Sequence, residues 1–399
     1  MKLVSRSLAS ASLISICVVV GTAARADDGE DRDSQSKRYV VNPLTSDLPK
    51  IAPNTDPVLQ NAWGVAFTPG ASPFWISDNA TGCSTLYDGA GIPQPTSPKP
   101  LQVAIPLPGG KVPPTACQMV NPNANPPPTN AAPTGMAWNP TTTFLVPGTS
   151  IAAAFIWATE DGTISAWAGG LGNLTPPLPA NNAVLAFTSE TAVYKGLVFG
   201  TNANGVFLFA TNFHDGTVDV LAANGSKGFR LATKKEVDGD FSDPNIPAGF
   251  APFGIENIDG DLFVSYAKQD AEKHDDVAGP GNGFVDVFDT DGHLLRRFAS
   301  RGPLNSPWGM TRASFAFGRF SGDILVGNFG NGKINVFSTQ GRFIDELDLP
   351  NGKPLVIDGL WKLTLGGGRN SDSDTLYFTA GPNDEKDGLF GTITPAAKK

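Results

Sequence analysis

The stretch NAWGVAF, residues 61–67, is the first of six copies of one phrase, in which a glycine follows an aromatic residue or proline and precedes alternating apolar residues. The other copies are PTGMAW (133–138), YKGLVFG (194–200), APFGIENI (251–258), SPWGMTRA (306–313) and GLWKLTLG (359–366). Measured at the glycine, or at Lys362 in the last copy, they stand 53 to 71 residues apart. A unit of this size holds four short strands, which is one propeller blade. The sequence therefore predicts an all-β fold, a six-bladed β-propeller with four-stranded blades.

The segments after each copy fit the inner strands of a blade. Each copy is followed by a strand rich in aromatic and β-branched residues, such as PFWISD at 73–78 and TLYFTA at 375–380. Strands of this composition are buried on both faces, as they are between neighbouring blades. A third strand then opens with glycine in every unit, and in GTISAW, GTVDVL, GFVDVF and GKINVF it alternates with period two.

The last unit ends after its third strand, GLFGTITP. The stretch RYVVNPL, residues 38–44, stands before the first unit and has no other role. We expect it to pair with the last blade as the missing outer strand, because this closes the ring and removes exposed sheet edges.

The N-terminal residues match a secretory signal peptide. A basic start, an apolar run over residues 8–20 and an A-x-A cleavage site at 24–26 give this pattern. We therefore expect residues 1–26 to be removed. The charged segment 27–37 is expected to be disordered.

Residues 38–399 are expected to form a single six-bladed β-propeller domain. Two insertions interrupt its repeat, a Pro-rich segment at 91–133 and a polar loop at 267–282. Long loops in compact domains are usually functional or mobile.

Charge restricts the partners. Cleavage would remove three basic residues and no acidic one, so the net charge of −9 would become −12. Nucleic acids and anionic membranes need a basic surface, so neither is expected as a partner. No stretch after the signal peptide approaches the roughly 20 apolar residues of a membrane span. We expect a secreted monomer, periplasmic or extracellular, whose ligand is a glycan, another polymer or a protein.

Secretion leaves two cysteines, Cys83 and Cys117, in an oxidising compartment. A single disulfide between them is the expected state there. The alternative is a pair of separate buried thiols.

Loops joining second to third strands, and loops entering first strands, gather around the mouth of the central channel in such a propeller. The predicted ligand-binding residues there are Trp63, Asp78, Asn79, Glu160, Asn212, His214, Gln269, Trp308, Asn328, Trp361 and Glu385. Oxygen ligands of this kind suit Ca²⁺ or another divalent cation, with Glu160, Asn212 and Asn328 as the predicted metal ligands. The competing interpretation is that Asp, Asn and Gly serve tight β-turns. His274 and His293 are interpreted as surface residues.

Several longer phrases carry a resemblance. The runs at 241–258, 324–337 and 376–391 resemble an uncharacterised family of secreted six-bladed propeller proteins of bacteria and fungi, some with a PEP-CTERM sorting tail. This chain ends in TPAAKK without that tail, which favours release. The blade phrase is more distantly similar to NHL repeats and to SMP-30/gluconolactonase-like propellers. Those lactonases hold an axial divalent cation through Glu, Asn and Asp side chains.

Two functions remain open at this stage, and with them whether the chain is an enzyme. The first is a ligand- or protein-binding module that uses the channel-mouth face, favoured because no catalytic motif appears. The alternative is a divalent-metal-dependent hydrolase or lyase of the lactonase type. The alternative requires at least three of the carboxylates and amides at the channel mouth to converge on one point. Convergence of Glu160, Asn212 and Asn328 on a common axial point would favour it, and side chains turned outward or bonded to their own loops would favour the binding module.

Overall fold

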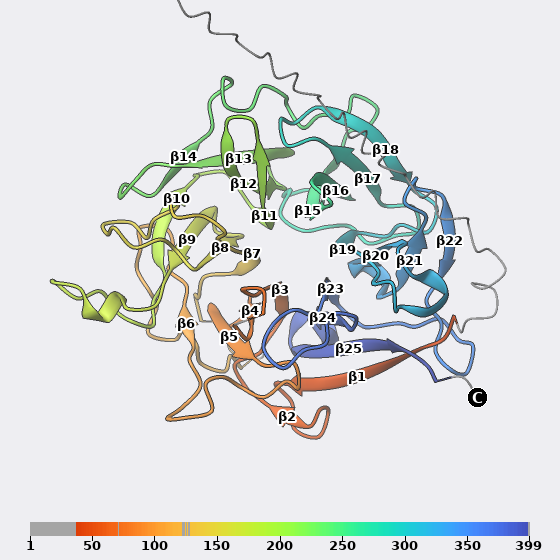
Figure 1. Cartoon of the computed structure of the whole chain (residues 1–399), viewed down its shortest axis with the longest axis horizontal. Coiled ribbons are helices and arrows are strands. Elements are labelled where there is room, and N and C mark those ends of the chain that lie inside the picture. Colours follow the sequence, from red (N-terminus) through yellow and green to blue (C-terminus); the bar gives the residue numbers. More distant parts are fainter. Residues whose placement is uncertain (1–36, 71, 122–123, 125, 127, 398–399) are drawn as a thin grey trace, which may run out of the picture.

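The described part of the computed structural model comprises residues 37–397 without residues 71, 122, 123, 125 and 127. Within it, six sheets surround one axis, antiparallel except for one short parallel pair in the last blade, and the strand that carries the repeated phrase lies nearest the centre in each sheet (Figure 1). The predicted six-bladed β-propeller is confirmed. The predicted signal peptide, and all but the last residue of the segment 27–37, lie outside the described residues.

Blades 1 to 3 follow the chain from the first to the third copy of the phrase. Blade 1 comprises β3 (Ala62–Ala66), β4 (Phe74–Asp78), β5 (Cys83–Tyr87) and β6 (Val103–Ala104). Blade 2 comprises β7 (Pro133–Trp138), β8 (Phe155–Thr159), β9 (Thr163–Trp167) and β10 (Val184–Thr188). Blade 3 comprises β11 (Tyr194–Asn202), β12 (Gly205–Asn212), β13 (Thr217–Ala223) and β14 (Phe229–Leu231).

Blades 4 to 6 complete the circle. Blade 4 comprises β15 (Phe250–Ile258), β16 (Asp261–Lys268), β17 (Phe284–Phe288) and β18 (Leu294–Ser300). Blade 5 comprises β19 (Pro307–Arg312), β20 (Ile324–Asn328), β21 (Ile334–Phe337) and β22 (Phe343–Glu346). Blade 6 comprises β23 (Leu360–Leu365), β24 (Leu376–Ala380), β25 (Leu389–Pro395), β1 (Tyr39–Ser46) and β2 (Asn54–Thr55).

Short helical turns lie in the connections. They are η1 (Leu171–Asn173), η2 (Gly318–Phe320), η3 (Phe329–Asn331) and α2 (Pro382–Glu385). None of the helices in the described residues has the length and apolar character needed to cross a membrane.

The N-terminal strand closes the ring as predicted. β1 pairs antiparallel with β25 from Tyr39 opposite Pro395 to Ser46 opposite Leu389, and the two strands lie side by side in Figure 1. The strand is two residues longer at its end than the predicted segment 38–44, and β2 adds a fifth strand beside it. The last blade thus depends on residues from both ends of the described chain.

The glycine of the repeated phrase is explained by close packing around the axis. A Cβ on Gly64 would lie 2.5 Å from the carbonyl oxygen of Thr134, and one on Gly135 would lie 2.5 Å from the backbone nitrogen of Leu197. Each contact is to the first strand of the next blade. Glycine therefore lets the innermost strands approach one another.

Outer strands are the least regular part of each blade. β6 spans only Val103–Ala104 within the apolar stretch LQVAIPL at 101–107. Pro100 and Pro106 flank it, and proline cannot donate a ladder hydrogen bond. In this blade the disulfide Cys83–Cys117, with an S–S distance of 2.04 Å, joins the Pro-rich insertion to β5.

Closure by β1 has a measurable energetic consequence. Tyr39 is fully buried, stacks on Phe317 of blade 5 and donates a hydrogen bond of 2.9 Å to its carbonyl oxygen. We expect Tyr39→Ala to lower the free energy of unfolding in urea by about 3 to 5 kcal/mol, as for other large buried aromatics. Tyr39→Phe should cost only about 0.5 to 1.5 kcal/mol, because it removes the hydrogen bond and keeps the ring. A loss below about 0.5 kcal/mol for Tyr39→Ala would show that β1 does not hold the ring closed.

Candidate functional site

An aromatic cluster fills the centre of the propeller. Trp63 of β3 stacks on Trp361 of β23 with ring centroids 3.4 Å apart, and Trp308 of β19 meets both rings edge-on. Phe253 of β15 lies 6.0 Å from Trp361. These four residues each occupy the position just before the phrase glycine or its equivalent, so the repeat itself directs one side chain per blade toward the axis.

Blade 3 places a lysine at this position. The Lys195 side chain is only 2% exposed, and its ammonium lies 5.3 Å from the Trp63 ring centroid and 5.7 Å from that of Phe213. The ammonium donates a short hydrogen bond to Glu160 and lies 3.6 Å from Asp275. A buried ammonium is held here by two carboxylates and two aromatic faces, the environment that stabilises cations in proteins.

Amides extend this arrangement across neighbouring blades. Asn79 donates to the second oxygen of Glu160 at 3.0 Å, and Asn61 donates to the side-chain oxygen of Asn79 at 3.2 Å. Asn61 also donates to Glu385 at 2.7 Å and accepts the indole N–H of Trp361 at 3.0 Å. One hydrogen-bonded network therefore links blades 6, 1, 2 and 3 above the aromatic cluster.

We use the name channel mouth for six residues that this network and the Lys195–Asp275 ion pair connect. They are Asn61, Asn79, Glu160, Lys195, Asp275 and Glu385. All six stand at the ends of strands or in loops on one side of the propeller, where second-to-third strand loops and entries to first strands meet.

The charged groups at the channel mouth shift one another's pKa values. Burial alone would lower the pKa of Lys195, but the carboxylates of Glu160, Asp275 and Glu385 outweigh it and raise that pKa. Burial, reinforced by the nearby Glu160 carboxylate, raises the pKa of Glu385 to about 7. Lys195 therefore stays charged at neutral pH, whereas Glu385 is poised to gain or lose a proton.

The polar loop at 267–282 forms one wall of the channel mouth. Gln269 donates to the backbone oxygen of Phe213 at 2.6 Å, which fixes the start of the loop against blade 3. His274 lies 2.9 Å from Asp275, and this hydrogen bond raises the pKa of His274 and lowers that of Asp275. The long insertion thus brings an acid and an imidazole to the ion pair of Lys195.

Three side chains here have the chemistry of metal ligands. One donor atom each from Glu160, His274 and Asp275 lies within 4.8 Å of the others. Only Glu160 belongs to the metal-ligand set predicted from sequence. The ammonium of Lys195 contacts both carboxylates of this group, so a cation already lies beside them.

The other two predicted metal ligands are engaged in hydrogen bonds within blade 3 and around blade 5. Asn212 donates to Asp215 at 2.9 Å and accepts from the backbone of the same residue. Asn328 donates to the Pro303 carbonyl at 2.8 Å and to Asn331 at 3.2 Å. The structure therefore does not place Asn212 and Asn328 as partners of Glu160. The bonds of Asn212 to Asp215 fit the turn interpretation, whereas the bond of Asn328 to Pro303 joins it to the loop between blades 4 and 5.

The remaining predicted ligand-binding residues occupy different environments. Trp63, Trp308 and Trp361 are at most 5% exposed and form the floor beneath the channel mouth. Asp78 is fully buried and accepts a hydrogen bond from Thr85 within blade 1, and burial raises its pKa well above the usual range. His214 lies at an exposed turn, 3.1 Å from Asp215.

Sequence reasoning missed Lys195, Asn61 and Asp275, and it treated His274 only as a surface residue. Lys195 could have been found from the sequence, because it is the one charged residue at its position in the repeat. The six residues at that position are Trp63, Thr134, Lys195, Phe253, Trp308 and Trp361. Asn61 and Asp275 had no such signal, since their roles depend on how separate loops meet in space.

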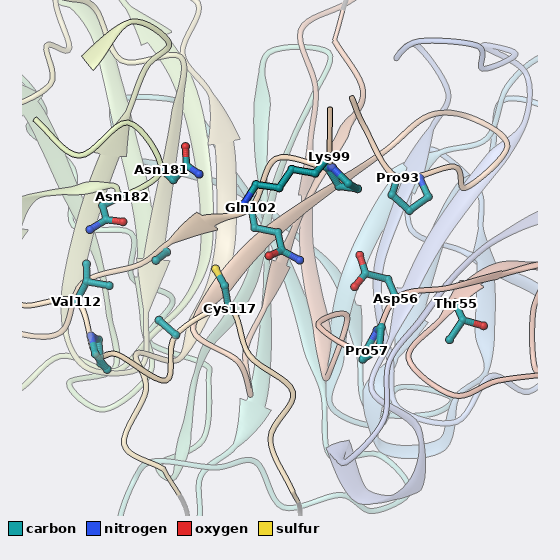
Figure 2. Close-up of a pocket in the computed structure, with 14 residues that line it drawn as sticks. Thr55, Asp56, Pro57, Pro93, Lys99, Gln102, Val112, Cys117, Asn181 and Asn182 are labelled. Atoms are coloured by element: carbon teal, nitrogen blue, oxygen red, sulfur yellow. The ribbon is translucent and has the colours of Figure 1, made fainter. Parts of the chain in front are cut away.

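A separate hollow of about 610 Å³ lies at the outer edge of blade 1. Figure 2 shows Lys99, Gln102, Asn181 and Asn182 around it, with Asp56 on its other side. Both oxygens of Asp56 already accept hydrogen bonds, from Tyr87 and from the backbone of Val58. This hollow brings together no set of acids and bases comparable to the channel mouth.

The raised pKa of Glu385 predicts a specific pH dependence of stability. A carboxyl whose folded pKa lies above its unfolded value costs stability as pH rises from about 4.5 to about 7, because the unfolded chain ionises first. Glu385→Gln keeps the acceptor for Asn61 and cannot ionise. We expect it to match wild type at pH 4.5 and to exceed it by on the order of 1 to 2 kcal/mol at pH 8, measured by urea unfolding. Equal stability of the two proteins across this range would show that Glu385 titrates normally.

Comparisons with known proteins come from sequence and from structure. No family model matches the chain. Among solved structures, the chain is similar to a glucose dehydrogenase (TM-score 0.48, 12% identity, 90% of this chain and 100% of that one). It is also similar to virginiamycin B lyase from Staphylococcus aureus (TM-score 0.46, 12% identity, 90% and 99% covered). A third is a gluconolactonase from Xanthomonas campestris (TM-score 0.43, 12% identity, 85% and 88% covered).

Sequence similarity is stronger to proteins of Acanthamoeba polyphaga mimivirus. The uncharacterized protein L690 is 33% identical over 358 residues, which cover 89% of this chain and 85% of the viral one. The uncharacterized protein R648 is 31% identical over 358 residues, covering 89% and 80%. At this identity and coverage, the chain belongs to the same family as the mimivirus proteins L690 and R648.

Proposed function

We propose that this chain is a secreted, extracytoplasmic binding propeller that takes its ligand at the channel mouth and uses Lys195 as the fixed cation of that site. The observation that carries the proposal is the buried ammonium of Lys195, held between Glu160 and Asp275 over the faces of Trp63 and Phe213. A hydrogen-bonded polar ring over an aromatic floor is the usual composition of a ligand site, which combines apolar walls with a few placed polar groups.

The binding role is supported by what the network leaves accessible. Glu160 and Lys195 are nearly buried and pair with each other, so they act as the rigid base of the site. Asp275 and His274 are exposed on the loop above them, and Glu385 is half-buried beside them. Ligand specificity would then reside in the exposed groups, while the buried pair holds the geometry.

A divalent-metal centre is the second candidate, favoured by the grouping of Glu160, His274 and Asp275 within 4.8 Å. In a hydrolase or lyase, a metal held there would act as a Lewis acid on the substrate. The ammonium of Lys195 argues against this use, because a divalent ion beside it would be repelled and would have to displace it from two carboxylates. A metal centre predicts that divalent ions raise the melting temperature of the wild-type protein, whereas the binding function with Lys195 as its cation predicts no such shift.

The binding function predicts a ligand whose affinity depends on Glu160. Glu160→Gln leaves an acceptor for Lys195 but removes the charge that holds it, so the site should loosen. We expect any ligand that the mature protein selects from an array of glycans and peptides to bind Glu160→Gln at least about tenfold more weakly, since a hydrogen-bonded charge pair is lost.

Glu346→Gln is the matched control for this experiment, because Glu346 of β22, the outer strand of blade 5, pairs with Lys333 at 2.8 Å and is not part of the channel-mouth network. Its ligand affinity should equal that of wild type. A ligand that binds all three proteins equally would show that binding takes place on another surface.

A further inference from the structure

We propose that the ligand of the channel mouth presents a protonated alkyl amine, such as a lysine side chain of a partner polypeptide, and that this amine binds Glu385. The inference rests on the binding function proposed above and adds the chemical class of its ligand.

The channel mouth is already built to hold an ammonium. Lys195 brings its charge between Glu160 and Asp275 and over the rings of Trp63 and Phe213. Aromatic faces combined with carboxylates are the arrangement by which proteins recognise ammonium ligands. Lys195 and, when protonated, His274 supply the positive charge of this group, and among the described residues neither donates a hydrogen bond to Glu385.

Glu385 is the carboxylate with unused capacity. In the described part of the chain, its hydrogen bonds come only from Asn61, at 2.7 Å on Oε2. A carboxylate accepts about four hydrogen bonds, so Oε1 remains available. The neighbouring Lys386 does not compensate it, because the ammonium of Lys386 lies 3.7 Å from Asp384. An external ammonium would supply both the charge and the donors that Glu385 lacks.

The surroundings suit the alkyl part of such a ligand. Phe329 of η3 stacks on Trp361 with centroids 3.9 Å apart and is only half-buried. Trp361 in turn donates its indole N–H to Asn61, which holds Glu385. An apolar surface therefore borders the polar ring, and the methylene stem of a lysine can pack on apolar surface while its head group stays with a carboxylate.

Amine binding should be linked to protonation of Glu385. The pKa of Glu385 is raised to about 7, and a bound cation would favour its ionised form. The amine of lysine keeps its proton throughout this range. The titratable and charged groups that face Glu385 or share its loop are Glu160, Lys195, His274, Asp275, Asp358, Asp384, Lys386 and Asp387. Affinity should therefore rise between pH 5.5 and pH 8, by up to about tenfold per pH unit on the acid side.

The test uses the mature protein and two peptides that differ by one charge. The probe is acetyl-Gly-Lys-Gly-amide, and its matched control carries Nε-acetyl-lysine at the central position. Binding is followed by NMR titration of the indole N–H signal of Trp361. We expect the lysine peptide to bind at least about tenfold more tightly than its acetylated form, with an affinity that rises with pH. Glu385→Gln should lose this preference and its pH dependence.

Asp384→Asn is the matched variant, because Asp384 lies on the same loop with its side chain 93% exposed and outside the network. It should bind the lysine peptide as wild type does. Equal binding of the two peptides, absence of lysine-peptide binding, or unchanged binding by Glu385→Gln would each overturn the inference. The proposed binding function would stand in all three cases if a ligand selected from the glycan and peptide array still binds Glu160→Gln more weakly than wild type. Failure of the amine inference can therefore be distinguished from failure of the binding function.

Discussion

The burial of one ammonium constrains the whole central region of this propeller. Removing a lysine head group from water costs several kcal/mol unless opposite charges and hydrogen bonds replace the lost hydration. Lys195 meets this requirement through Glu160 of the preceding blade and Asp275 of the polar loop in blade 4. The positions of both acids, and of the amides that orient Glu160, follow from that requirement.

The fold was predictable because the sequence repeats one phrase in each of the six blades. The phrase glycine and the aromatic residue before it recur at blade-sized intervals, and each has a direct physical reason in close packing around the axis. Closure by residues 38–44 was predictable as well, because the last unit lacks an outer strand. The extent of short outer strands such as β6 is harder to predict from sequence, because proline and loop contacts override the apolar pattern there.

The site was predictable only in part. Glu160, Asn79 and Glu385 were predicted to lie at the channel mouth, and hydrogen bonds through Asn61 and Asn79 join them in one network. Asn212 and Asn328 occur in loops of the same kind, yet Asn212 bonds to Asp215 in its own turn and Asn328 bonds to Pro303 in the loop between blades 4 and 5. Sequence alone cannot separate these two outcomes, because the direction of a side chain after a strand depends on the local turn and on which neighbouring blade offers a partner.

The most direct measurement of the central claim is the melting temperature of wild type and of Lys195→Met, in EDTA and then with Ca²⁺, Mg²⁺, Mn²⁺ or Zn²⁺. If Lys195 is the fixed cation of the channel mouth, wild type should show no shift with any ion. Lys195→Met should be less stable in EDTA and should regain several degrees with at least one ion, because Glu160, His274 and Asp275 are then free to bind it. Lys333→Met, which removes a partly buried lysine from its pair with Glu346, should respond to no ion. A shift of several degrees in wild type that Glu160→Gln abolishes would contradict this account and identify a divalent-metal centre.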